Sequence, residues 1–416
     1  MTDDVLRREL FALPEGLVYL DGNSLGALPR AVEDRVRTVV TEEWGTGLIG
    51  SWNRPPSAGP GEGWIDLPAR VARRLAPLLG AGADEIHVGE STSQALFATM
   101  VAASRLRPDR SVLVLDRTTF PTDAYVAQSV CRLLGLTLRW CDGPGDSPDG
   151  GVAAVEAALD DDVALVSLTH VDFRTGALWA MPEVTRVVQE AGALAQWDLC
   201  HSTGALEVDL AGSGADLAVG CTYKYLNAGP GSPAYTWVAR RHHDDLDPPV
   251  AGWMGHTEPF AMRLDHTPRR GVGRLAVGTP PVLALSALDA ALTVFDGVDM
   301  AAVRRASVAL TEQFVAGVDT LARRHAEEQL SLASPRDPER RGSQVSLRHP
   351  HAYGLVQALV ARGVVGDFRD PDIARFGFAP LYVSPADVDS ALEALAAVLA
   401  GREHHDPRYA ERHAVT

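Results

Sequence analysis

Residues 193–201, with the sequence ALAQWDLCH, combine a short apolar run with a polar and ionisable end. Similar apolar runs recur from about residue 85 to residue 240 and alternate with helix-like segments. The predicted strands are 111–115, 163–169, 193–197, 217–221 and 235–239, and the helices between them are 123–134, 152–159 and 182–191. Near-continuous apolar strands separated by helices are typical of a sheet that is covered on both faces. The sequence therefore predicts an α/β fold with a doubly wound, mostly parallel sheet.

The pattern changes to helix after residue 281. Apolar residues there keep to one helical face, namely Val303, Leu310, Phe314, Val318 and Leu321. Two later runs, 344–347 and 364–368, are predicted strands, and 385–399 is a predicted last helix. We expect an N-terminal segment over 1–60 that packs with the small domain, a large domain over 61–281 and a smaller α+β C-terminal domain over 282–416.

Composition excludes several classes of protein. Of the 416 residues 46% are apolar, which is enough to bury two domain cores. Acidic residues outnumber basic ones by 54 to 38, and a net charge of -16 would repel a phosphate backbone, so no nucleic-acid partner is expected. No apolar run reaches the roughly 18–20 residues of a membrane helix, and no signal peptide is recognisable. We expect a cytoplasmic protein with no membrane partner.

The cysteines do not form a recognisable site. Cys131, Cys141, Cys200 and Cys221 lack a CxxC pair and a dense disulfide pattern. In a large cytoplasmic protein such residues are typically buried thiols. No metal site is predicted.

Lys224 is the only lysine among the 38 basic residues, the other 37 being arginines. A guanidinium stays protonated, whereas a lysine amine can lose its proton and condense with an aldehyde. Composition alone leaves open a chance lysine on a solvated face. The residues around Lys224 distinguish a reactive amine from a chance surface lysine.

Side chains suited to binding a ligand, all but one of them polar, follow the predicted strands at the edge where ligands of open α/β sheets bind. They are Thr92, Ser93, Phe120, Asp123, Asp198, His201, Tyr223 and Lys224. Thr92 and Ser93 start a helix, where free N–H groups favour a phosphate. A phosphate site, an aromatic ring, a strand-end carboxylate and a lone lysine together indicate pyridoxal phosphate. Each feature alone has a structural reading as a helix cap, a turn residue or a core histidine, but their joint occurrence favours the cofactor.

The chain resembles the kynureninase family of fold-type I pyridoxal phosphate enzymes over nearly its whole length. The matching motifs are LDGNSLG (20–26), FPTD (120–123), WDLCH (197–201), YKYLN (223–227), GWMGH (252–256), GTPPV (278–282), RGSQVSLRH (341–349), GDFR (366–369) and RFGFAPLY (375–382). Such a set is far more specific than any single glycine pattern.

The resemblance implies a role for each matching position. Lys224 would bond covalently to the cofactor aldehyde, and Asp198 would pair with the ring nitrogen. The other cofactor contacts would be Thr92, Ser93 and Tyr223 at the phosphate, Phe120 against the ring, and Asp123, Thr169 and His201 around it. Trp253 and Thr279 would reach the phosphate from the neighbouring subunit of a homodimer. Arg375 would receive the substrate α-carboxylate, a task that suits a planar fork of donors.

The implied reaction is hydrolysis of the Cβ–Cγ bond of L-kynurenine, or of a 3-hydroxy or otherwise modified kynurenine, to alanine and anthranilate or its hydroxy form. The pathway, whether tryptophan catabolism toward NAD or specialised metabolism, stays open. Met254, Gln94 and Ala95 depart from the family pattern, and the segment 52–64 does not align residue by residue. These differences leave the aryl pocket undefined, including whether Trp52 or Trp64 lines it.

Two kinds of alternative remain. Another fold-type I enzyme, such as a cysteine desulfurase or an aminotransferase, would share the cofactor site. A desulfurase needs a mobile nucleophilic cysteine, which the positions of the four cysteines do not favour. A catalytically silent ligand-binding regulator would have no need to retain Lys224, Asp198 and Arg375 together.

Overall fold

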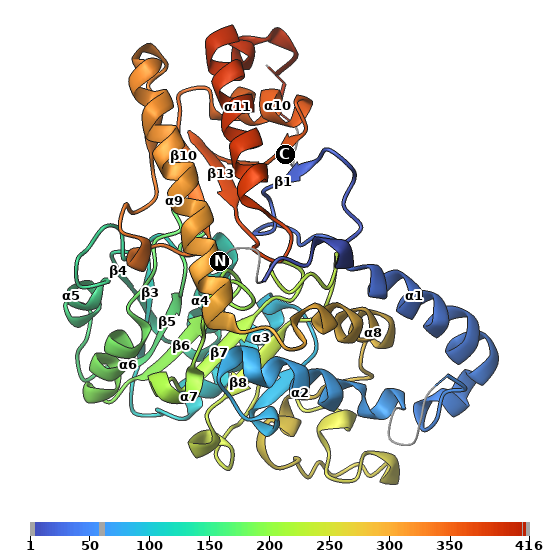
Figure 1. The fold of residues 1–416 in the computed structure, drawn as a ribbon. Helices are drawn as coiled ribbons and strands as arrows, with labels where there is room; N and C mark the ends of the chain where they lie inside the picture. Colours follow the sequence, from blue (N-terminus) through green and yellow to red (C-terminus); the bar gives the residue numbers. More distant parts are fainter. Residues whose placement is uncertain (1–4, 58–62, 410, 413–416) are drawn as a thin grey trace.

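The computed structural model describes residues 5–57, 63–409 and 411–412. A large sheet with its helices forms the lower part of the molecule in Figure 1, and a smaller sheet with three helices stands above it. The long helix α9 (Met300–Arg324) runs from one part into the other. The boundary expected at residue 60 falls within 58–62, outside the described residues, so the division into domains stays a prediction.

The large sheet has seven strands in the order β2-β8-β7-β6-β5-β3-β4. They are β2 (Ile86–Val88), β3 (Val112–Asp116), β4 (Thr137–Cys141), β5 (Val163–Thr169), β6 (Leu194–Asp198), β7 (Leu217–Gly220) and β8 (Tyr235–Val238). β8 pairs antiparallel with β7 and β2, and the other pairs are parallel. The register places Thr169 beside Asp198 at the carboxyl ends of β5 and β6.

Helices cover both faces of this sheet, as the apolar strands require. Alternate residues of β3 enter different cores: Leu113 and Leu115 pack with α3 and α4, and Val112 and Val114 belong to the core that includes α6. The helices of this part are α1 (Arg30–Thr38), α2 (Leu67–Leu79), α3 (Thr92–Arg105), α4 (Pro121–Leu134), α5 (Val152–Glu156), α6 (Met181–Glu190), α7 (Leu210–Ser213) and α8 (Val282–Ala291). The α/β class with a mostly parallel sheet is confirmed.

The smaller sheet has the order β12-β13-β10-β9. Its strands are β9 (Ser331–Leu332), β10 (Gln344–Arg348), β12 (Asp367–Arg369) and β13 (Ile373–Gly377), and α9, α10 (Ala352–Ala361) and α11 (Pro385–Gly401) pack beside them. The five apolar residues expected on one face of α9 are all buried. The N-terminal segment joins this part, because β1 (Val18–Tyr19) pairs with β11 (Val364–Val365) and Phe11 packs against Tyr382.

Some expected elements differ from those observed. The predicted strand 364–368 is two strands, β11 and β12, with Gly366 between them. The edge strand β4 was not predicted, because four of its five residues are not fully buried and lack the apolar signal of an interior strand. The strand expected over 193–197 is shifted by one residue, so Asp198 is its last member.

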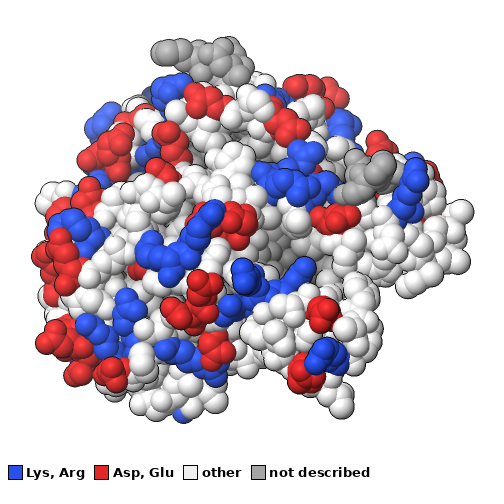
Figure 2. All heavy atoms as spheres, turned by 90° about the horizontal axis from the view of Figure 1, so that it is seen from below, with Lys and Arg blue, Asp and Glu red and all other residues white. Residues whose placement is uncertain are grey.

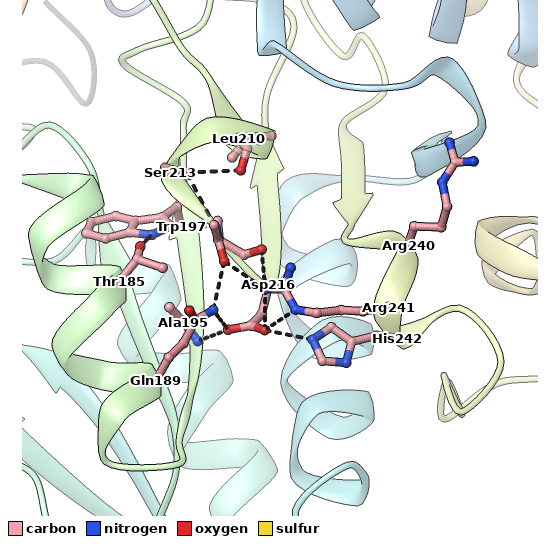
Figure 3. Close-up of polar contacts among 12 residues, drawn as sticks. Thr185, Gln189, Ala195, Trp197, Leu210, Ser213, Asp216, Arg240, Arg241 and His242 are labelled. Atoms are coloured by element: carbon pink, nitrogen blue, oxygen red, sulfur yellow. Dashed lines mark hydrogen bonds and ion pairs between the residues drawn. The ribbon is translucent and has the colours of Figure 1, made fainter.

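Asp216 directly precedes β7, at the amino ends of the parallel strands, whereas Asp198 lies at their carboxyl ends. Its side chain connects several elements of the large sheet. Its carboxylate accepts hydrogen bonds from the backbone N–H of Ala195 at 2.8 Å, Gln189 Nε2 at 2.9 Å and Arg241 Nη2 at 2.7 Å, and contacts His242 Nε2 at 2.7 Å. These partners come from β6, α6 and the turn after β8 and converge on one side chain (Figure 3). Burial opposes ionisation of Asp216, but the four partners outweigh it and lower its pKa to about 2.

Charged side chains of both signs are interspersed on the face seen from below, and wide stretches of it carry none (Figure 2). Among the described residues, no helix combines the length and the apolar character that a membrane crossing requires.

Candidate functional site

One cavity of about 310 Å³ brings together ten of the twelve residues predicted for the site. These ten are Thr92, Ser93, Phe120, Asp123, Thr169, Asp198, His201, Tyr223, Lys224 and Arg375. They converge because parallel strands β3, β5, β6 and β7 all present their carboxyl ends at this edge. The cavity lies where the large sheet meets the small one, since Arg375 comes from β13.

Lys224 points into the cavity beside His201. Its Nζ lies 2.9 Å from His201 Nε2 and 5.8 Å from the centre of the Tyr223 ring. Burial and the nearby charge of Lys224 hold the pKa of His201 well below its usual range. His201 is therefore neutral and can accept a hydrogen bond from the Lys224 amine, which fixes the direction of that amine.

Two buried carboxyl groups form the floor of the cavity. Asp198 is 4% exposed, and its Oδ1 accepts from the backbone N–H of Cys200 at 2.7 Å. Burial and the adjacent Asp198 carboxylate raise the pKa of Asp123 well above its usual range. A neighbouring cation would relieve this repulsion. The protonated ring nitrogen of pyridoxal phosphate is such a cation, so the carboxyl pair fits the cofactor.

A phosphate fits where the start of helix α3 lines the cavity. Helix α3 begins at Thr92, after the N-cap Ser91, and its first turn leaves backbone N–H groups without helical partners. The hydroxyls of Thr92 and Ser93 line the same space. Burial raises the pKa of Tyr223 above its usual range, so its phenol stays neutral and can donate a hydrogen bond to a phosphate oxygen.

An aromatic pair forms one wall. Phe120 is 41% exposed, and its ring meets the ring of Phe173 edge to face at a centroid distance of 5.2 Å. The exposed ring of Phe120 offers a surface on which a planar cofactor can stack. The cavity thus combines the donors, the carboxylate, the aromatic face and the amine that pyridoxal phosphate requires.

Arg375 also lines the cavity, next to Phe173, but most of its donors are already in use. It is 1% exposed, and its Nε and Nη2 both donate to the carboxylate of Asp367. Nη2 also donates to Ser24 Oγ at 2.7 Å, and Nη1 donates to the Phe173 carbonyl at 2.6 Å. Four of its five N–H groups are therefore occupied by the protein itself, which leaves one for a ligand.

Arg369 lines the cavity wall beside Arg375 and also has a donor available. Its Nη2 donates to Asp367 Oδ2 at 2.6 Å and to Ser24 Oγ at 3.2 Å. Its Nε is buried and has no hydrogen-bond partner among the described residues. Burial and the charge of Asp367 raise the pKa of Asp21 to about 7, so this carboxyl is largely protonated below that pH. Two arginines then face one carboxylate, and the wall has a net positive charge suited to a carboxylate ligand.

The remaining predicted residues lie outside the cavity. Trp253 is 38% exposed and Thr279 is exposed as well. Trp52 and Trp64 pack against each other with ring centres 5.8 Å apart, and Trp64 Nε1 donates to Glu43 Oε2 at 2.7 Å. Neither tryptophan lines this cavity in the single chain.

Sequence reasoning assigned no role to several lining residues, among them Asn23, Ser24, Phe173 and Arg369. Two of the quoted motifs, LDGNSLG and GDFR, contain three of them. Their contact with the cavity depends on the pairing of β1 with β11 and on the bridge between Asp21 and Gly377 of β13, which a local pattern does not reveal. Phe173 follows the end of β5, a position at which such a residue could have been sought.

Comparisons with known proteins agree with this geometry. Residues 303–395 match the family model of the kynureninase C-terminal domain. The chain is 48% identical over 415 residues to a kynureninase of Burkholderia mallei, covering 98% of this chain and 95% of that protein. It is 50% identical over 394 residues to a kynureninase of Deinococcus radiodurans, covering 94% and 92%.

Solved structures show the same fold. A cysteine desulfurase from Thermococcus onnurineus NA1 superposes with a TM-score of 0.79 at 18% identity, covering 96% of this chain and 98% of that one. A C-DES variant with glycine covalently linked to its pyridoxal phosphate cofactor gives a TM-score of 0.78, also at 18% identity, covering 94% and 98%. At this identity the likeness concerns the fold alone.

Proposed function

The chain belongs to the kynureninase family, whose members are pyridoxal phosphate-dependent hydrolases of carbon–carbon bonds, and on that premise we propose how its own residues bind and cleave a kynurenine. The substrate is L-kynurenine or a 3-hydroxy or otherwise modified kynurenine, and the products are L-alanine and the corresponding anthranilate. The observation that carries the proposal is the position of the only lysine, inside the cavity and within reach of Asp198, His201 and a cationic wall.

Lys224 has two tasks. It would hold the cofactor through a covalent bond of its Nζ, and once released it is the amine available to take the proton from the substrate α-carbon. Neutral His201 directs the free amine into the cavity. When bound, pyridoxal phosphate supplies an electron sink for the negative charge left on the substrate.

Asp198 would pair with the ring nitrogen. The backbone N–H of Cys200 fixes one of its oxygens at 2.7 Å, which orients the carboxylate toward the cavity. The neighbouring Asp123, whose pKa is raised, can stay protonated and so does not compete for the same cation. Thr169 Oγ1 donates to Asp123 at 3.3 Å and holds that carboxyl in place.

The substrate α-carboxylate would bind between Arg375 and Arg369. Within the described part of the chain, Arg375 has one N–H group without a partner and Arg369 has its buried Nε–H without one. Together they can donate to both carboxylate oxygens, whereas Arg375 alone would first have to give up one of its present partners. This assignment refines the expected role of Arg375.

The rival activities lose support. All four cysteines are buried free thiols, so none is placed as the mobile nucleophile of a desulfurase. A sequence identity of 48–50% to kynureninases over nearly the whole chain also disfavours an aminotransferase or a silent regulator.

The working unit would be a homodimer with active sites at the subunit interface. Large apolar side chains are exposed on the segments around Trp44 and Trp253, including Leu48, Ile49, Phe260, Met262 and Leu264. A monomer would leave this apolar surface in water. Trp253 and Thr279 are exposed here and would complete the phosphate site of the other subunit. The free thiols are consistent with a cytoplasmic location.

The test is direct. The purified enzyme, supplied with pyridoxal phosphate, is incubated with L-kynurenine or 3-hydroxykynurenine, and formation of the fluorescent anthranilate is followed together with equimolar alanine. Sulfide release from L-cysteine is measured in parallel. We expect an anthranilate product and no sulfide; sulfide without anthranilate would reverse the assignment.

A further inference from the structure

A cluster of buried metal-binding side chains lies in the small domain, away from the cavity. Glu328 follows α9, His349 follows β10, and His404 lies just beyond α11. They are 6%, 0% and 3% exposed. Segments far apart in the sequence thus place a carboxylate and two imidazoles in one interior site, near the helices α10 and α11 in Figure 1.

The separations suit a single ion. One ligand atom from each residue lies within 4.8 Å of the other two. Glu328 Oε2 is 2.9 Å from His404 Nε2 and 3.9 Å from His349 Nε2. Zinc bonds of 2.0–2.2 Å at tetrahedral angles place neighbouring ligand atoms about 3.3–3.5 Å apart, so small side-chain rotations would bring all three atoms to bonding distance.

His349 Nε2 supplies an independent sign of a missing partner. This atom is buried and has no hydrogen-bond partner among the described residues, although it faces the Glu328 carboxylate. His349 Nδ1 accepts from the His351 backbone N–H at 3.0 Å. Metal binding at Nε2 would move the imidazole proton to Nδ1 and break that hydrogen bond, a small loss beside three metal–ligand bonds.

Two features surround the cluster: a close contact between α10 and the segment after α11, and a pair of exposed histidines. A Cβ added to Gly354 of α10 would lie 2.2 Å from the His404 carbonyl oxygen, so glycine lets the chain after α11 approach α10. Exposed His351 and His405 lie over the buried pair, with ring centres 4.4 Å apart. They place two solvent-exposed imidazoles beside the buried pair.

We propose that Glu328, His349 and His404 form a structural binding site for a divalent transition-metal ion, with zinc as the best match. Two neutral imidazoles and one carboxylate form a zinc ligand set that leaves a fourth position for water. Arg402 Nε lies 3.4 Å from Glu328 Oε1 and leaves Oε2 for the ion. The ion would tie the C-terminal end of the chain to α9 and α10. Sequence spacing gives no hint of it, because the ligands lie on three separate segments.

The experiment uses the untagged full chain loaded with pyridoxal phosphate. The protein is treated with a chelator, incubated with excess ZnCl₂ and desalted, and its zinc content and thermal midpoint are measured. We expect one zinc ion per chain and a higher midpoint after loading. Failure of the wild-type chain to retain zinc overturns the proposal without reference to any variant.

Variants locate the ion. His404→Gln and His349→Gln are expected to lose the bound zinc and the rise in the midpoint, and the matched control His325→Gln, three residues before Glu328, is expected to keep both. With Co²⁺ as the probe, the wild-type chain should show the visible absorption of four-coordinate cobalt, and His404→Gln should not. Zinc retained undiminished by both ligand variants overturns the assignment. Kynurenine turnover is a separate readout, because the cluster lies outside the cavity.

Discussion

In the proposed function, cofactor binding and proton transfer would both depend on one residue, Lys224. We expect Lys224→Arg to keep the positive charge but to abolish the visible absorption of bound cofactor, because a guanidinium cannot condense with an aldehyde. Turnover of kynurenine should fall by roughly 10³-fold or more. Absorption spectra and steady-state kinetics measure both. Arg348→Lys, a swap at an exposed arginine, is the control, and a coloured, active Lys224→Arg enzyme would refute the role.

In the proposed function, Asp198 would act on the electron sink rather than on cofactor retention. Asp198→Asn keeps the shape of the side chain but removes the charge that would stabilise a protonated ring nitrogen. We expect the variant to hold its cofactor and to lose most of its kcat. Thr185→Ser, a buried change on α6 outside the cavity, serves as the control. Full turnover by Asp198→Asn would remove this residue from the mechanism.

Arg369 and Arg375 should respond differently to substitution. Arg369→Gln removes free donors, so KM should rise roughly 10- to 100-fold with cofactor content unchanged. Arg375→Ala should in addition destabilise the fold by about 3–5 kcal/mol, because it leaves the Asp367 carboxylate buried without its main partner. Kinetics and urea unfolding separate the two effects. Arg348→Gln is the control, and a wild-type KM for Arg369→Gln would place the carboxylate elsewhere.

Secondary-structure elements differ in how far the sequence predicts them. Interior strands such as Val163–Thr169 are buried along their whole length and carry an unmistakable apolar pattern. The edge strand Thr137–Cys141 is only partly buried, so its pattern is weaker. Most of the residues that line the cavity follow strand ends, so their convergence was predictable from the sequence, whereas their contacts with a cofactor stay a prediction. Arg375 binds Asp367 and Ser24 through tertiary packing. No local sequence pattern predicts these contacts.

Asp216 joins elements at the edge of the sheet away from the cavity. Its pKa is lowered from 3.8 to about 2, so its ionised form stabilises the fold above pH 4, and this contribution is lost as the pH falls from about 4 to about 2. The shift corresponds to about 2 kcal/mol. We expect Asp216→Asn to cost about 2–4 kcal/mol at pH 7, measured by urea unfolding, and the difference from wild type to shrink toward pH 2.

A matched control is available for this carboxylate. Asp160 pairs with Arg139 at 2.8 Å, but its side chain is 48% exposed, so Asp160→Asn should leave the free energy of unfolding nearly unchanged. If Asp216→Asn is as mild as this control at pH 7, the convergence of hydrogen bonds in Figure 3 does not stabilise the sheet.

At the scale of the whole molecule, the proposed interface predicts that two inactive chains can repair each other. Lys224→Arg removes the amine but keeps Thr279, and Thr279→Arg blocks the phosphate site of the neighbouring subunit but keeps Lys224. Each variant alone should be inactive. A mixed dimer contains one site with the intact lysine of one chain and the intact threonine of the other. Random pairing after coexpression makes half of the dimers mixed, so about one quarter of wild-type activity should return.

The control for complementation is coexpression of Lys224→Arg with Asp198→Asn. Both residues line the same cavity of one chain, so a mixed dimer should gain no site that is intact in both positions. Thr279 is exposed in the single chain, and its substitution should therefore leave folding intact, which circular dichroism of the lone variant checks. Absence of recovery in well-folded mixed dimers of Lys224→Arg and Thr279→Arg would show that each chain builds its phosphate site without its neighbour.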